Sequence, residues 1–298
     1  MFQGLFNRSN AGGDVTDQLA IWFASVFAVG DEDISDEAWT VLAERGGVLG
    51  TSAWDAVGRE LHAYNGERPA RVRRWMQLLI EQEHTGCVTD FLDYAFDWVD
   101  LAEDPELVLD LLAHLMSPKV VASPGFRTAN LEVETRGGIH WLDDAWQTVF
   151  FPALDRVAID ILTVAEGALR RHFRLQAKVR NSKHDSFNYR RKSIRHDHEH
   201  TYRQPIDAII DAARDSLDAM WEQDVAYANL VVSRWIASPY PLLRRLAVHA
   251  VTTSPATPDF RVALVLAHAL TTDRATEPET FHLLGFAAKD ADSGLGRV

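Results

Sequence analysis

Cysteine is almost absent from this sequence of 298 residues, in which Cys87 is the only one. One cysteine cannot form an internal disulfide, and in an oxidising compartment it would remain a free thiol. Residues 1–8 also lack the basic segment and the apolar run that an export signal requires. Both absences favour a cytoplasmic location.

Long apolar runs are missing as well. The most apolar stretches, residues 19–29 and 262–270, are much shorter than the ~20 residues that a membrane-spanning helix needs. Nevertheless, 47% of the residues are hydrophobic, which is enough to build a large buried core. We therefore expect a globular protein with no membrane partner, in which these apolar stretches are core helices.

The motifs of nucleotide-dependent and hydrolytic catalysis are missing too. The nearest approach to a phosphate-binding loop, residues 46–52, is rich in glycine but has no lysine, and it is typical of a turn before a helix. Neither a GxGxxG dinucleotide motif after a strand nor a GxSxG nucleophile motif occurs. The sequence thus predicts a non-catalytic protein without a cofactor.

Helical periodicity is present throughout, because apolar residues recur every three or four positions. The clearest case is residues 204–222, a predicted helix whose first turn holds a proline. Its apolar side carries Ile206, Ile209, Ile210, Ala213, Leu217, Met220 and Trp221. Its opposite side is expected to face solvent and carries Asp207, Asp211, Arg214, Asp215 and Asp218. The predicted fold class is all-α.

Toward the C-terminus, three predicted helix starts share a hydroxyl residue followed by proline, a combination typical of a first helical turn. The hydroxyl residues are Ser238, Thr257 and Thr276, and the helices are predicted to end at residues 251, 270 and 288. Helices of this length, joined by tight polar turns, are typical of HEAT-like antiparallel helix pairs. An ordinary helical bundle uses the same parts and remains the alternative.

Turn signals divide the chain into three predicted parts. An N-terminal helical domain covers residues 1–125, where recurring tryptophans are expected to fill the gaps between packed helices. An irregular connector covers residues 126–150, with at most one short β-element near 129–137, where apolar and polar residues alternate from Leu131. Residues 151–298 are expected to begin with a long helix and to continue with the HEAT-like helices.

Charge is unevenly distributed along the chain. The net charge is −13, yet residues 170–195 hold ten basic residues and one acid, Asp185. In one interpretation these cations bind the phosphates of nucleic acid, helped by the stacking rings of Phe187 and Tyr189. In the other they neutralise acids in residues 90–106 or in the helix that follows. The candidate contacts to phosphate or to a protein partner are Arg170, Arg171, Arg174, Lys178, Arg190, Arg191, Lys192 and Arg195.

Three alternating histidines, His196, His198 and His200, follow the basic segment. On an extended strand they would lie on one side and could hold a metal ion, which makes a metal-dependent hydrolase a further hypothesis. Their spacing matches neither HExxH nor paired CxxC motifs, the patterns that indicate a metal site most strongly.

Residues 186–203 and the following 206–217 resemble the helical region that follows the effector domain in large bacterial anti-phage defence proteins of the sirtuin-like and NTPase-associated type. That family has an Arg-Ser-Ala-Ile-Glu-Pro-His-Glu-like segment before an aliphatic LIDAAR helix. The counterpart here, residues 192–199, lacks the proline and part of the spacing. Residues 238–250 and 280–284 are similar to the HEAT-like repeats of the same family.

The resemblance implies a region that senses a phage component or holds an oligomer together, while a separate domain destroys a nucleotide. This chain lacks that effector domain, so we predict a scaffold or sensor that binds a protein partner, either a defence effector or a phage component. Homo-oligomerisation is compatible with this role. We also expect a subunit of a multigene system or a piece of a longer chain, since a solenoid ending here would expose Phe281, Leu284 and Phe286.

Overall fold

The computed structural model describes residues 99–123, 130–180, 191, 193–195 and 203–295, with isolated residues between 34 and 96. The chain divides into two compact units, Met1–Leu115 and Met116–Val298. The predicted three-part division stays a prediction. Most of the helices predicted before residue 99 lie outside the described residues.

In the first unit, the described helix is α6, Pro105–Leu115. Proline at the first position and Glu106 in the first turn suit the start of a helix, and the Asp104 carboxylate accepts a hydrogen bond from the Leu107 backbone N–H. The buried side of α6 is aliphatic and consists of Leu107, Val108, Leu111, Leu112 and Leu115. Arg73 forms an ion pair with Asp104 at the start of the helix.

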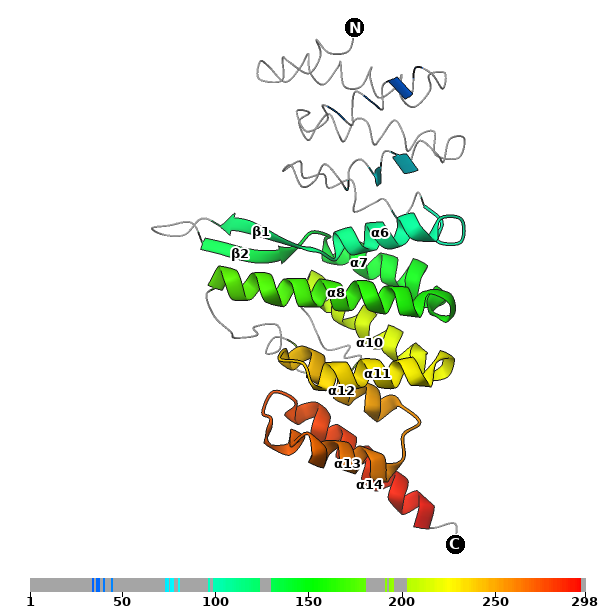
Figure 1. Cartoon of the computed structure of the whole chain (residues 1–298), viewed down its shortest axis with the longest axis vertical. Coiled ribbons are helices and arrows are strands. Elements are labelled where there is room, and N and C mark those ends of the chain that lie inside the picture. Colours follow the sequence, from blue (N-terminus) through cyan, green and yellow to red (C-terminus); the bar gives the residue numbers. More distant parts are fainter. Residues whose placement is uncertain are drawn as a thin grey trace. The chain divides into compact units, whose positions relative to one another are not determined.

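The second unit begins with an antiparallel hairpin of β1, Pro118–Ser123, and β2, Asn130–Thr135, in which Val120 faces Val133. The predicted short β-element corresponds to β2. Its partner β1 was not predicted, because Ser117 followed by proline indicates a turn. Both strands contact α8, Leu154–Arg180, which runs beneath the hairpin (Figure 1).

Between the hairpin and α8 the chain is helical rather than irregular. Helix α7, Ile139–Ala145, continues through a wider π-helical turn, Trp146–Phe150, and a short 3₁₀ turn, Phe151–Ala153. Residues 139–150 of the predicted connector are thus helical, where the sequence indicated irregular structure. The physical reason is tertiary, because Trp146 and Phe150 are buried in the second unit and hold this stretch in helical form.

The rest of the second unit is a series of helices close to those predicted. They are α10, Pro205–Gln223; α11, Val225–Ile236; α12, Pro241–Thr253; α13, Pro258–Ala267; and α14, Glu277–Leu295. Helix α8 packs against α10, α11 against α12 and α13 against α14, while α12 also contacts α14 (Figure 1). The prediction of an all-α array of packed helix pairs is confirmed.

Local capping explains only part of these helix starts. The Thr257 hydroxyl caps α13 by accepting a hydrogen bond from the Phe260 N–H at 3.3 Å, as predicted. Ser238 does not cap α12, which begins at Pro241 after Tyr240, and its hydroxyl accepts from the Tyr240 N–H instead. Among the helices that the structure describes, none combines the length and apolar character needed to cross a bilayer.

Candidate functional site

One side of α10 that the sequence predicted to face solvent is buried. Asp211, Arg214 and Asp215 are only 4%, 2% and 5% exposed. The prediction fails because Arg191, residues 193–195 and α7 pack against this side, and polar side chains alone cannot reveal such contacts. Helix α10 is consequently buried on its apolar side and along much of its charged side.

A charge cluster forms there from Arg191, Arg203, Asp211, Arg214 and Asp215. The Asp211 carboxylate accepts from Arg191 and Arg214, each at 2.5 Å, and from Arg203 at 2.7 Å, while Arg214 Nε donates to Asp215 at 2.6 Å. Burial by itself would raise the pKa of Asp211, but the adjacent guanidinium groups outweigh it and hold the pKa below its usual value. Asp211 is therefore the shared anion of the cluster.

Hydrogen bonds from the charge cluster and from its neighbours hold Arg191 and residues 193–195 against the helices. Arg214 Nη1 donates to the Ile194 carbonyl at 2.9 Å, and Arg245 of α12 donates to the Arg191 carbonyl at 2.7 Å. Glu279 of α14 accepts from the Ile194 N–H at 3.1 Å and forms a two-pronged ion pair with Arg245 at 2.8 Å. This short segment is thus tied to three helices that are distant in sequence.

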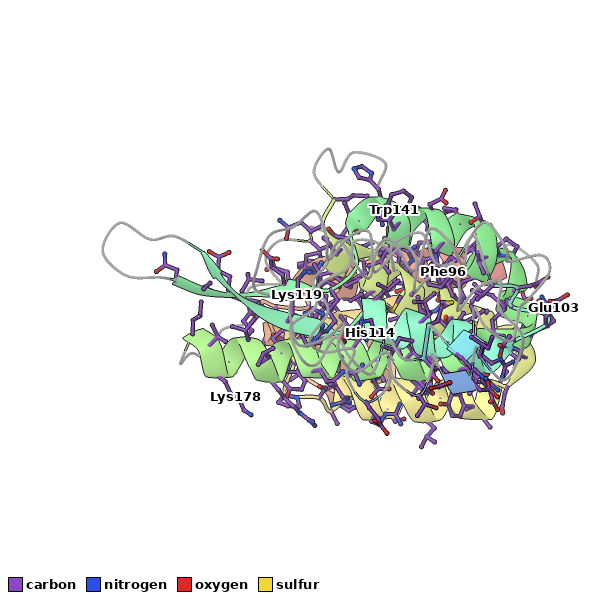
Figure 2. The ribbon with its side chains drawn as sticks, turned by 90° about the horizontal axis from the view of Figure 1, so that it is seen from above. Phe96, Glu103, His114, Lys119, Trp141 and Lys178 are labelled. Atoms are coloured by element: carbon purple, nitrogen blue, oxygen red, sulfur yellow. The ribbon has the colours of Figure 1, made fainter. Side chains whose placement is uncertain are left out.

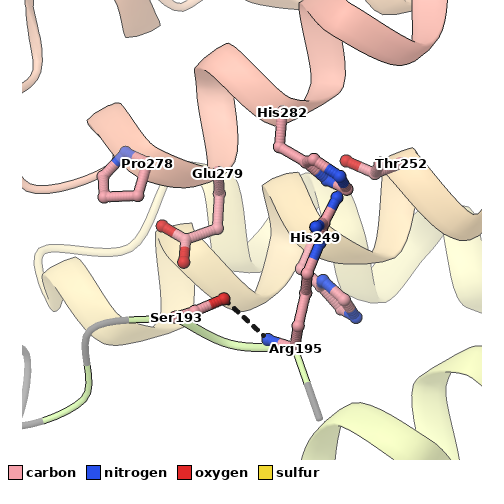
Figure 3. Close-up of a pocket in the computed structure, with 7 residues that line it drawn as sticks. All are labelled: Ser193, Arg195, His249, Thr252, Pro278, Glu279 and His282. Atoms are coloured by element: carbon pink, nitrogen blue, oxygen red, sulfur yellow. Dashed lines mark hydrogen bonds between the residues drawn. The ribbon is translucent and has the colours of Figure 1, made fainter. Parts of the chain in front are cut away.

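Beside the fastened segment lies a cavity of about 110 Å³. Its wall comes from residues 193–195, α12 and the first turns of α14, and consists of Ser193, Arg195, His249, Thr252, Pro278, Glu279 and His282 (Figure 3). The Thr252 hydroxyl donates to the Val248 carbonyl, and His249 Nε2 lies 3.7 Å from an Asp218 carboxylate oxygen. The wall is polar and mainly cationic or neutral.

The predicted contact residues separate into three groups. Arg170 bonds to Glu166 on its own helix at 2.8 Å, and Arg191 belongs to the charge cluster. For Arg191 the neutralising interpretation is confirmed, since its partners are acids of the helix that follows. Arg171, Arg174 and Lys178 are exposed, at positions that share one side of α8, and Lys178 projects outward (Figure 2).

The remaining predictions can be placed only in part. Arg195 is exposed and lines the cavity, but Arg190 and Lys192 lie outside the described residues. His196, His198 and His200 also lie outside them. Within the part of the chain that the structure describes, no three histidine, cysteine or acidic side chains are grouped so that they could hold a metal ion.

Several large apolar side chains of α13 and α14 are exposed, and we call this set of residues the α13–α14 surface. Leu266 is 73% exposed and Phe281 is 64% exposed. The full set of exposed large apolar side chains on these helices is Phe260, Val262, Leu266, Phe281 and Phe286. The predicted exposure of Phe281 and Phe286 is confirmed, whereas Leu284 is half-buried.

The chain matches no family model, no curated protein and no solved structure. The resemblance to defence proteins therefore stays a prediction that depends on the sequence segments named above. The Arg245–Glu279 ion pair and the cavity that His249 and His282 both line were not predicted, because only the packing of α12 on α14 brings these residues together.

Proposed function

We propose that this protein is a non-catalytic helical scaffold, and that it binds a protein partner through the α13–α14 surface as a sensor or assembly subunit of a bacterial anti-phage defence system. The observation that carries the proposal is the exposure of Leu266 and Phe281 on the last described helix pair. The defence context comes from the resemblance of residues 186–217 and is independent of this surface.

The composition of α13 supports the proposal that a partner covers its exposed side. Its ten residues include only two charged ones, Asp259 and Arg261, and Arg261 is buried, with an ion pair to Asp290 and a hydrogen bond to the Ser254 carbonyl. Of its ten residues only Arg261 and Val265 are buried, whereas the large apolar Phe260, Val262 and Leu266 are exposed. Large apolar side chains that stay exposed together on one helix are typical of interaction sites.

The partner expected here is a protein with a complementary apolar surface. The large side chains at the α13–α14 surface are aliphatic or aromatic, so shape and apolar contact would provide most of the affinity. Burial of one leucine contributes about 1.5–3 kcal/mol. A single charged substitution at the centre of such a contact therefore has a measurable effect.

The Leu266→Glu variant is expected to lose the partner, weakening binding by about 30-fold or more, because a carboxylate would be buried without a counter-ion. The full chain would be co-expressed with the products of the neighbouring reading frames, and complexes would be counted by mass photometry after co-purification. Leu230→Glu on α11 is the matched control, since Leu230 is 59% exposed and lies outside the surface.

Retention of the partner by Leu266→Glu, or equal loss with Leu230→Glu, contradicts the proposal. Self-association of the wild-type chain that Leu266→Glu abolishes would identify a second copy as the occupant instead. Thermal unfolding of both variants should remain close to wild type, because both positions are exposed.

Nucleic-acid binding is the alternative, and the exposed Arg171, Arg174 and Lys178 on one side of α8 favour it. If these cations contact phosphates, replacing all three by alanine should lower the slope of log affinity against log salt by about 3. Fluorescence anisotropy with single-stranded oligonucleotides at several salt concentrations measures this slope. An unchanged slope, or the same loss in Arg156→Ala near the start of α8, would exclude these three cations as phosphate contacts.

A further inference from the structure

The cavity beside residues 193–195 has a use that the scaffold function does not require. We propose that it binds a single phosphate group, as the free ion or on a small phosphorylated molecule. The proposal depends on the charge, the hydrogen-bond donors and the size of the cavity, and it is independent of the α13–α14 surface.

The wall holds one cation, Arg195, that has no acidic partner among the described residues, and one acid whose charge is compensated. Glu279 is the one acid in the cavity wall, and its charge is compensated by Arg245, which donates to both carboxylate oxygens. The Ile194 N–H donates to the same carboxylate. Arg195 has no ion pair with any residue that the structure describes, so its guanidinium is available to a bound anion.

Hydrogen-bond donors surround the space. In Figure 3, His249, His282 and Arg195 lie on one side of the cavity, and Ser193 and Glu279 lie on the other. The Ser193 oxygen already accepts from the Arg195 backbone N–H at 3.2 Å, which leaves its hydroxyl hydrogen for a ligand. The His282 ring packs edge-on against the Phe286 ring, with the two ring centroids 4.7 Å apart.

The first turn of α14 adds to the attraction. Pro278 and Glu279 belong to that turn and form part of the wall, so the cavity lies near the positive end of a 19-residue helix. The helix end only reinforces the arginine and the two histidines, which carry the argument.

The size of the cavity selects among anions. Sites for drug-sized ligands and cofactors occupy about 300–1,000 Å³, whereas this cavity measures about 110 Å³. The enclosed space suits one tetrahedral oxyanion rather than a whole nucleotide. Arginine suits such a group because its planar fork can donate two parallel hydrogen bonds to phosphate oxygens.

Isothermal titration calorimetry of the full chain with inorganic phosphate tests the proposal, with sodium chloride of equal ionic strength as the reference titrant. We expect saturable binding, and the Arg195→Gln variant should weaken it about tenfold or more, since hydrogen bonds to charged groups are the strong ones. Arg156→Gln is the matched control, because Arg156 is an exposed arginine of α8 outside the cavity.

Non-saturating heats, or equal affinity in Arg195→Gln and wild type, would overturn the proposal. A second titration with O-phosphoserine distinguishes the two sources of the phosphate group. Binding of both compounds supports a site open to substituted phosphates, and binding of inorganic phosphate alone supports a site for the free ion. Because Arg195 is exposed, its replacement is not expected to disturb folding, and circular dichroism of the variant checks this point.

Discussion

Replacing Asp211 by alanine is expected to destabilise the protein by about 3–5 kcal/mol, because removing one partner leaves buried charges without compensation. Arg191 and Arg214 both bond to this carboxylate at 2.5 Å and are almost fully buried. Neither guanidinium can lose its proton to relieve the burial. Urea unfolding followed by tryptophan fluorescence measures the loss of stability.

Asp160→Ala is the matched control for this experiment, since Asp160 is an exposed aspartate of helix α8. A loss for Asp211→Ala within about 0.5 kcal/mol of that control would show that the charge cluster contributes little. The isosteric Asp211→Asn variant should fall between the two, because it keeps the shape and some hydrogen bonding of the side chain but lacks its charge.

Acidification is expected to weaken the fold through His172. This side chain is 1% exposed, and its Nε2 lies 3.1 Å from the Met116 carbonyl, to which the neutral ring donates a hydrogen bond. Burial lowers the pKa of His172 from 6.5 to about 4, although the bond to Met116 acts in the opposite direction. The folded protein therefore keeps this ring neutral at pH values where the unfolded chain protonates it.

The sign of the effect follows from proton uptake. Below pH 6.5 the unfolded state binds a proton that the folded state refuses, so stability falls progressively until about pH 4. The full loss amounts to about 3 kcal/mol. Urea unfolding at pH values between 7 and 4 should give a shallower decline in His172→Gln than in wild type. His268→Gln, at an exposed position, should decline as steeply as wild type, and parallel profiles for all three proteins would refute the role of His172.

Local patterns sufficed for much of the fold. Apolar spacing located α10 through α14 because each helix buries one apolar side, and proline marked the first turns of α10, α12 and α13. Strand β1 escaped prediction since its first residue, Pro118, is more common in turns. Its pairing with β2 and its contact with α8 stabilise it, and both depend on residues elsewhere in the chain.

The site was less predictable because its members meet only in three dimensions. Asp211 and Arg214 lie one turn apart on one helix, and the polar pattern around them predicts that this side is exposed to solvent. Arg191, a partner of Asp211, lies 20 residues away from it, and Arg245 lies 34 residues away from Glu279. Opposite charges at such separations are abundant in a chain with 43 acids and 30 lysines and arginines, so no single pair is informative before folding.

The buried charges on α10 also limit how the neighbouring backbone can be seated. Two apolar surfaces can shift along each other by one helical turn at little cost. The Asp211 carboxylate has one low-energy position, because it is bonded to the guanidinium groups of three arginines, at residues 191, 203 and 214. A shift of Arg191 along the helix would leave a buried charge without its partner, at a cost of several kcal/mol. The charge cluster therefore sets the register of Arg191 and residues 193–195 on α10, and with it the position of Arg195 in the cavity wall.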